Sequence, residues 1–128
     1  NTGAGMVGEL PGPVSESDFL NSLKKKLHVP YIRHSALRGK KVHKVAFCGG
    51  SGAFLIGDAI RSGADVFVTG DVKYHQFFDA DGKIVIADVG HYESEQFTRE
   101  LISDFLKEKF PTFALRISKV NTNSVKYL

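Results

Sequence analysis

Short apolar runs alternate with amphipathic stretches along most of this 128-residue chain. Apolar runs predict buried strands at residues 45–48, 66–68, 84–87 and 113–117. Apolar residues spaced three or four apart predict helices that begin near Ser15 and that cover residues 53–61, 73–78 and 91–110. Strands that alternate with helices are typical of an α/β fold, so we expect a mostly parallel sheet with helices on both faces.

The first residues of the chain have a different composition from the rest. Residues 1–14 are rich in Gly and Pro and show no periodic pattern, so we expect an irregular lead-in there. The absence of an initiating Met indicates that an amino-terminal part is missing. Ser15 and Asp18 resemble a capping box at the start of the first helix, and residues 29–34 are a candidate for a further strand.

Composition and charge exclude several classes of protein. No apolar stretch approaches the roughly 20 residues of a membrane-spanning helix, and the start lacks the basic and apolar regions of a secretory signal. The single Cys48 excludes an internal disulfide, so a cytoplasmic protein without a membrane partner is expected. The net charge of +3 comes largely from residues 24–26 and 38–44. No aromatic residues are interleaved there for base stacking, so nucleic acid is not an expected partner.

Polar side chains follow three successive strands of the predicted sheet. They are Ser51 after the first strand, Asp71, Lys73 and His75 after the second, and Asp88, His91 and Glu95 after the third. Right-handed crossovers bring the carboxyl ends of parallel strands to one edge of a sheet, where α/β proteins bind their ligands. The sequence therefore predicts one shared cleft for these side chains.

His91 and Glu95 lie one turn apart at the start of the last predicted helix. This spacing puts an imidazole and a carboxylate on one helical face, which is a candidate half of a metal site. The alternative is an ordinary helix start, in which the helix dipole favours a carboxylate. By the same reasoning, Asp88 could only brace its turn, Asp71 could cap the short helix and His75 could pack on it.

The glycine-rich segment Gly49, Gly50, Ser51 and Gly52 follows a strand and opens a helix. Its N–H groups could hold a phosphate or carboxylate of a ligand, although a simple tight turn explains it equally well. It is neither a P-loop nor a dinucleotide fingerprint, because no Lys-Ser/Thr follows and Leu55 stands where the third glycine would be. Cys48 at the strand end is expected to be an ordinary buried cysteine rather than a nucleophile.

Three segments in order, VAFCGGSG at 45–52, TGDVKYH at 69–75 and ADVGHYESE at 87–95, resemble the carboxyl-terminal half of the Nif-three-like family. These proteins are often named GTP cyclohydrolase 1 type 2 homologues. The segments GAGMVGEL at 3–10 and NTNS at 121–124 are also similar to this family. The resemblance implies that residues 15–128 are the carboxyl-terminal α/β part of a metal-binding domain, and that the chain is a partial domain.

The resemblance further implies a dinuclear site for divalent metal ions, Zn, Mn or Fe, with His91 and Glu95 as two of the ligands. The other family ligands, two adjacent histidines and an aspartate, belong to the amino-terminal half, and this chain has no His-His pair. The chain alone is therefore expected to hold a partial or empty site and to be inactive. Asp71, Lys73 and His75 match a family motif that lines the same cleft, which implies substrate binding or proton transfer.

Two classes of function follow from these residues. In the first, two metal ions activate a water that attacks a small phosphorylated or nucleotide-like ligand, so the intact protein is a metal-dependent hydrolase. In the second, the protein is a non-catalytic metal-binding or protein-interaction module. In both cases the resemblance suggests a homo-oligomer, and the substrate and the metal are not specified by these residues.

Overall fold

A computed structural model of the protein describes residues 3–126. The chain forms two compact units, Asn1–Ser94 and Glu95–Leu128, and each is described by itself. Among the described residues, no helix is long and apolar enough to cross a membrane.

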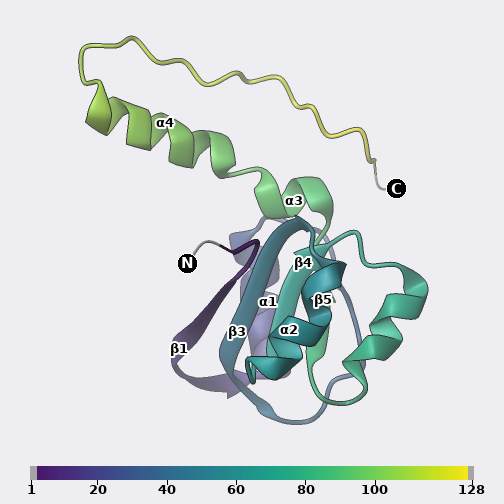
Figure 1. Ribbon diagram of the computed structural model, residues 1–128. Coiled ribbons are helices and arrows are strands. Elements are labelled where there is room, and N and C mark those ends of the chain that lie inside the picture. Colours follow the sequence, from purple (N-terminus) through teal and green to yellow (C-terminus); the bar gives the residue numbers. More distant parts are fainter. Residues whose placement is uncertain (1–2, 127–128) are drawn as a thin grey trace. The chain divides into compact units, whose positions relative to one another are not determined.

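A five-stranded sheet forms the centre of the first unit (Figure 1). In spatial order its strands are β1 (Met6–Ser15), β3 (Lys41–Ser51), β4 (Val66–Gly70), β5 (Val85–Asp88) and β2 (Arg33–His34). The three central strands pair in parallel, whereas β1 and β2 pair antiparallel at the two edges. The prediction of an α/β fold is confirmed. The centre of the observed sheet is parallel, as expected, and its two edges are antiparallel.

Strand β1 corrects the expectation of an irregular lead-in for residues 6–14, and residues 1–2 lie outside the described residues. It pairs with β3 at residues 6–9 and again at 14–15, with a register shift between the two stretches. Pro11 and Pro13 fall inside this shift, and an edge strand tolerates them because their missing donors are not needed in the ladder. Most of β1 is exposed, so its sequence lacks the apolar alternation that would predict a strand.

Helices cover both faces of the sheet and create two apolar layers (Figure 1). On one face, Leu20 of α1 (Glu16–Lys26) belongs to a cluster with buried valines of β3, β4 and β5. On the other face, Phe67 of β4 and Ile86 of β5 pack with η1 (Ala53–Leu55), α2 (Ile56–Arg61) and η2 (Tyr74–Ala80). Side chains alternate between the faces along a strand, which explains why apolar residues follow one another directly at 66–68 and 84–87.

The predicted start of α1 is confirmed. The Ser15 hydroxyl accepts a hydrogen bond from the backbone N–H of Asp18 at 3.0 Å and donates one to the Asp18 carboxylate at 2.6 Å. This cap satisfies a backbone donor that the first turn of a helix leaves without a partner. Helix α1 therefore begins directly where β1 ends.

A cluster of buried and half-buried charges lies at the opposite end of β4 from the polar turns. The Glu16 carboxylate accepts hydrogen bonds from the N–H groups of Arg38 and Gly39 at 2.9 and 3.0 Å. The guanidinium of Arg38 contacts the Asp65 carboxylate at 3.2 Å, and Asp65 also accepts from the N–H groups of residues 43 and 44 at 2.9 Å. These bonds attach the long connection before β3 to the sheet.

The chain after β5 differs from prediction in two respects. The expected helix at 91–110 is divided into α3 (His91–Glu95) and α4 (Thr98–Lys109), and no glycine or proline marks the break. The expected strand at 113–117 is absent, because residues 114–126 have no regular secondary structure. An apolar run alone does not make a strand, because a strand also needs a neighbour that completes its hydrogen bonds.

Candidate functional site

Three turns with polar side chains lie at one edge of the sheet, as the topology predicts. The register pairs Ser51 with Gly70 and Thr69 with Asp88, so β3, β4 and β5 end at neighbouring positions. The turns after these strands therefore lie side by side. This part of the prediction is confirmed for the turns of the first unit.

Asp71 and His91 form the most direct contact between two of these turns. The Oδ2 atom of Asp71 lies 2.7 Å from Nδ1 of His91. Each side chain is about half exposed, at 53% for Asp71 and 50% for His91. Asp71 has a φ of +56°, a left-handed conformation that a non-glycine residue adopts uncommonly. The turn after β4 thus aims a carboxylate at the first residue of α3.

The ends of β4 and β5 approach each other backbone to backbone. A Cβ atom added to Gly70 would lie 2.8 Å from the carbonyl carbon of Gly90 and 2.8 Å from the nitrogen of His91. Gly90 itself has a φ of +93°, which glycine adopts without strain. Both glycines are therefore required for His91 to start its helix beside the end of β4.

Ser94 connects α3 to the glycine-rich segment at the end of β3. Its hydroxyl accepts a hydrogen bond from the N–H of Gly50 at 2.8 Å and donates one to the carbonyl of His91 at 2.8 Å. Thr69 acts in the same region, since its hydroxyl accepts from the N–H of Gly52 at 3.0 Å and donates to the Gly50 carbonyl at 3.2 Å. These contacts fix all three turns to one another.

The glycine-rich segment differs in detail from the predicted turn. Gly49, Gly50 and Ser51 belong to β3, with an irregular register before Ser51, and the turn begins only at Gly52. The N–H groups of Gly50 and Gly52 bond to the hydroxyls of Ser94 and Thr69. A ligand cradle would have to use other groups of this segment, and that role stays a prediction. Ser51 itself is exposed.

Asp88 is buried beneath these turns. Its Oδ2 atom accepts a hydrogen bond from the N–H of Val72 at 2.9 Å, and its Oδ1 atom accepts from the N–H of Gly90 at 2.9 Å. Arg33 completes the arrangement through an ion pair with the same carboxylate. The observed contacts match the alternative in which Asp88 braces its turn.

Arg33 is a residue that the sequence did not single out. It lies on the short strand β2, whose register places it opposite Asp88 of β5. Its guanidinium also donates to the carbonyl of Val72 at 2.8 Å and lies 5.5 Å from the ring centre of Phe77. The partners of Arg33 are 39 and 55 residues away in sequence, so local sequence carries no signal for them.

The remaining candidates occupy simpler surroundings. Lys73 and His75 are exposed, and they lie just before and within η2. Glu95 is the last residue of α3 and the first of the second unit. Cys48 is buried, and its thiol donates to the carbonyl of Ala4 at 3.1 Å, in keeping with an ordinary buried cysteine. The roles predicted for Lys73, His75 and Glu95 stay predictions.

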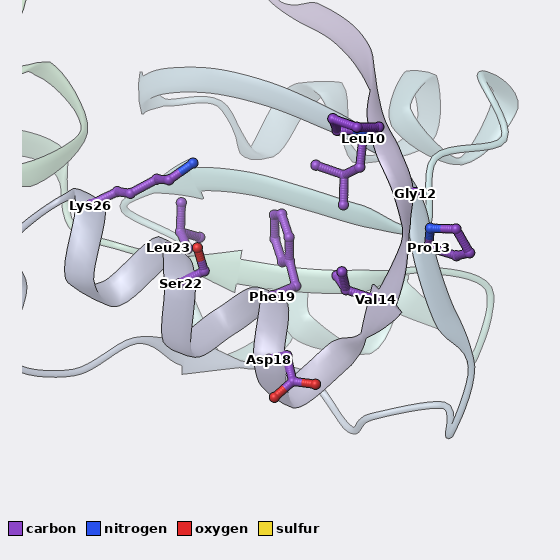
Figure 2. Close-up of a pocket in the computed structure, with 10 residues that line it drawn as sticks. Leu10, Gly12, Pro13, Val14, Asp18, Phe19, Ser22, Leu23 and Lys26 are labelled. Atoms are coloured by element: carbon purple, nitrogen blue, oxygen red, sulfur yellow. The ribbon is translucent and has the colours of Figure 1, made fainter.

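A groove of about 650 Å³ lies elsewhere, between β1 and α1 (Figure 2). Leu10, Pro13 and Val14 of β1 line one side, and Phe19 and Leu23 of α1 line the other. None of the predicted site residues lines this groove. The candidate chemistry therefore belongs to the edge of the sheet and not to this apolar groove.

Comparison with known proteins supports the family resemblance of the segments at that edge of the sheet. A family model described as Duf34/NIF3 (NGG1p interacting factor 3) matches residues 1–124. The chain belongs to the Duf34/NIF3 family. This confirms the resemblance found in the sequence, and the segments that carry it include the turns with Asp71 and His91.

Members of the Duf34/NIF3 family resemble this chain in sequence and in structure. A relative from Staphylococcus aureus (strain MSSA476), named "GTP cyclohydrolase 1 type 2 homolog", is 34% identical over 131 residues, which are 98% of this chain and 36% of the relative. The crystal structure of Staphylococcus aureus protein SA1388 matches with a TM-score of 0.82 and 29% identity over 97% of this chain and 42% of that one. A Bacillus cereus protein related to NIF3 matches with a TM-score of 0.81 and 30% identity over 98% and 36% of the two chains. The chain thus spans about a third of the length of the curated relatives it matches.

Proposed function

We propose that this chain is part of a dinuclear divalent-metal protein, a metal-dependent hydrolase that acts on a phosphorylated or nucleotide-like substrate. His91 and Glu95 would be its contribution to the ligands of two ions of Zn, Mn or Fe. The proposal goes beyond the family assignment, which supports a metal-related function without specifying a reaction.

The observation that carries the proposal is the contact between Asp71 and His91. Imidazoles that bind metals commonly donate their second ring N–H to a carboxylate, which fixes the tautomer and the orientation of the ring. The 2.7 Å distance between Oδ2 of Asp71 and Nδ1 of His91 fits this arrangement. An imidazole and a carboxylate are also donors that suit Zn, Mn and Fe alike.

This chain supplies only some of the ligands that such a metal site needs. Within residues 3–126, no group of three or more His, Cys, Asp or Glu side chains is arranged to hold a metal ion. A catalytic zinc site typically uses three protein ligands, and two ions need more. The proposal therefore assigns the remaining ligands to parts of the protein outside this chain.

Different residues of this chain would have different roles in the reaction. When bound, a pair of metal ions lowers the pKa of a water molecule and stabilises charge on a phosphoryl group. Lys73 is exposed on the turn that carries Asp71, so its ammonium group would attract an anionic substrate. His75 would move a proton to or from the substrate.

The alternative is a non-catalytic metal-binding or protein-interaction module. The incomplete set of metal ligands among the described residues supports this alternative for the chain by itself. Under either proposal we place the protein in the cytoplasm as a homo-oligomer. Sedimentation of the whole protein would test its assembly.

The test compares the whole protein that carries this chain with its His91→Ala variant. Bound metal is measured by elemental analysis, and hydrolysis is measured with a generic phosphoester and with GTP. The proposal expects about two ions per chain in the wild type, with loss of metal and of hydrolysis in the variant. His34→Ala is the matched control, because His34 is also exposed and its Nδ1 lies 2.8 Å from the carbonyl of Ser35. Metal without turnover would favour the metal-binding module. Unchanged metal in His91→Ala would refute His91 as a ligand, and the proposed function with it.

A further inference from the structure

The pair formed by Asp71 and His91 has features that stability does not explain. Both side chains are about half exposed, and an intramolecular hydrogen bond contributes only about 0.5–1.5 kcal/mol to stability. Asp71 nevertheless has a left-handed backbone, with a φ of +56°. This conformation is uncommon outside glycine, and here the turn that contains it brings the carboxylate to the imidazole of His91.

The hydrogen bond fixes the position of one proton. An ionised carboxylate only accepts hydrogen bonds, so the proton between Asp71 and His91 belongs to Nδ1 of the imidazole. A neutral imidazole with its proton on Nδ1 has the lone pair on Nε2. Any metal bond that His91 makes in this state must therefore involve Nε2.

We propose that Asp71 is a positioning residue that holds the Nδ1 proton of His91 and so presents Nε2 to a divalent metal ion. This inference rests on the proposed function, because it takes His91 to be a ligand. It also gives Asp71 a different role from the substrate binding or proton transfer that the family motif implied.

Contacts of the surrounding backbone fix the positions of Asp71 and His91. The buried carboxylate of Asp88 accepts from the N–H of Val72, which fixes the residue after Asp71. On the other side, Gly70 packs against the backbone of Gly90 and His91, and Ser94 bonds to the carbonyl of His91. A ligand held within a rigid frame keeps the geometry that a metal requires. The frame therefore makes the 2.7 Å contact a fixed feature of the turns.

The test uses Asp71→Ala and Asp71→Asn in the whole protein, with Zn²⁺ alone as the probe. Zinc affinity is measured by competition with a chromophoric chelator. The loss of such a carboxylate partner typically weakens metal binding about 10–100-fold, which is the result expected for Asp71→Ala. Asp71→Asn keeps an acceptor oxygen and tolerates the left-handed backbone, so a smaller loss is expected.

A second measurement detects a change that a purely structural role would not produce. Ring nitrogen chemical shifts of His91, recorded by NMR on the metal-free protein where the imidazole is neutral, report which nitrogen carries the proton. The proton is expected on Nδ1 in the wild type and in Asp71→Asn, and it should move toward Nε2 in Asp71→Ala. His34 provides an internal reference, because its Nδ1 lies beside the carbonyl of Ser35 and not beside a carboxylate.

Asp81→Ala is the matched control for both measurements. Asp81 is also exposed, has a φ of +44° and pairs with Lys83, so it reproduces the backbone and the charge of Asp71 away from His91. The control should keep wild-type affinity. Wild-type zinc affinity or a wild-type tautomer in Asp71→Ala would overturn the inference. If His91→Ala binds zinc as the wild type does, the proposed function itself fails, so the two failures are distinguishable.

Discussion

The carboxylate of Asp88, at the end of β5, accepts a hydrogen bond from the N–H of Val72 in the turn after β4, at 2.9 Å. The same carboxylate accepts from Gly90 and pairs with Arg33. One buried side chain thus holds the turns that carry Asp71 and His91.

Replacing Asp88 with Ala is expected to destabilise the protein by about 3 kcal/mol, because two backbone donors lose their acceptor at a buried position. Asp88→Asn should have a smaller effect, since the amide oxygen can still accept one of these bonds. Urea unfolding measures both changes. Asp58→Ala is the control, because its pair with Arg61 is exposed, and we expect a change below about 0.5 kcal/mol. Equal effects of Asp88→Ala and Asp58→Ala would contradict the bracing role.

Gly70→Ala is expected to destabilise the protein by about 2 kcal/mol or more, because the new Cβ atom would meet backbone atoms of Gly90 and His91 at 2.8 Å. Backbone at this distance has no flexible end that can move away. Gly8→Ala on the edge strand β1 is the matched control, since its Cβ would meet nothing within 4 Å. That control should be neutral or stabilising by up to about 1 kcal/mol. Thermal unfolding of the two variants would decide, and a neutral Gly70→Ala would disprove the close approach.

Ser94→Ala is expected to destabilise the protein by about 1–2 kcal/mol, because the N–H of the buried Gly50 would lose its acceptor. Slower hydrogen exchange at Gly50 in the wild type than in the variant would confirm the bond directly. Ser62→Ala serves as the control. Its hydroxyl donates to the carbonyl of Ala59, which keeps a second partner in the N–H of Ala64. The prediction fails if exchange at Gly50 is the same in the wild type and in Ser94→Ala.

The pH dependence of stability is expected to include a contribution from Asp65. Burial acts to raise the pKa of this carboxyl, but hydrogen bonds from the N–H groups of Lys44 and His43, together with Arg38, outweigh burial and lower the pKa. A carboxyl whose pKa is lower in the folded state stabilises the fold above its unfolded pKa of about 3.9. This stabilisation is lost as the pH falls through the folded pKa.

Asp65→Asn should therefore be less stable than the wild type at pH 7, and the difference should shrink as the pH falls below the unfolded pKa and through the lower folded pKa. Urea unfolding at a series of pH values measures this difference. Asp81→Asn is the control, because Lys83 also lowers the pKa of Asp81 but the pair is exposed. Its effect should disappear in high salt, whereas that of Asp65 should persist. A pH-independent difference for Asp65→Asn would show that its charge does not contribute.

Local patterns in the sequence were enough to predict the centre of the fold. Strands β4 and β5 are buried on both faces, so every one of their residues is buried and apolar runs at 66–68 and 84–87 predict them. Ser15 identified the start of α1, because a capping hydrogen bond is local. The turns that carry Asp71 and His91 were placed at one edge because the handedness of strand crossovers is nearly invariant.

The edges of the sheet and the contacts within the site could not be predicted from local patterns. Strand β1 exists because β3 supplies its hydrogen bonds, while the apolar run at 113–117 forms no strand in the part of the chain that the structure describes. The contact of Asp71 with His91 and the pairing of Arg33 with Asp88 join residues 20 and 55 positions apart. Local patterns report hydrogen bonds and burial within one element, whereas these contacts depend on which elements lie side by side, and that is decided when the sheet assembles.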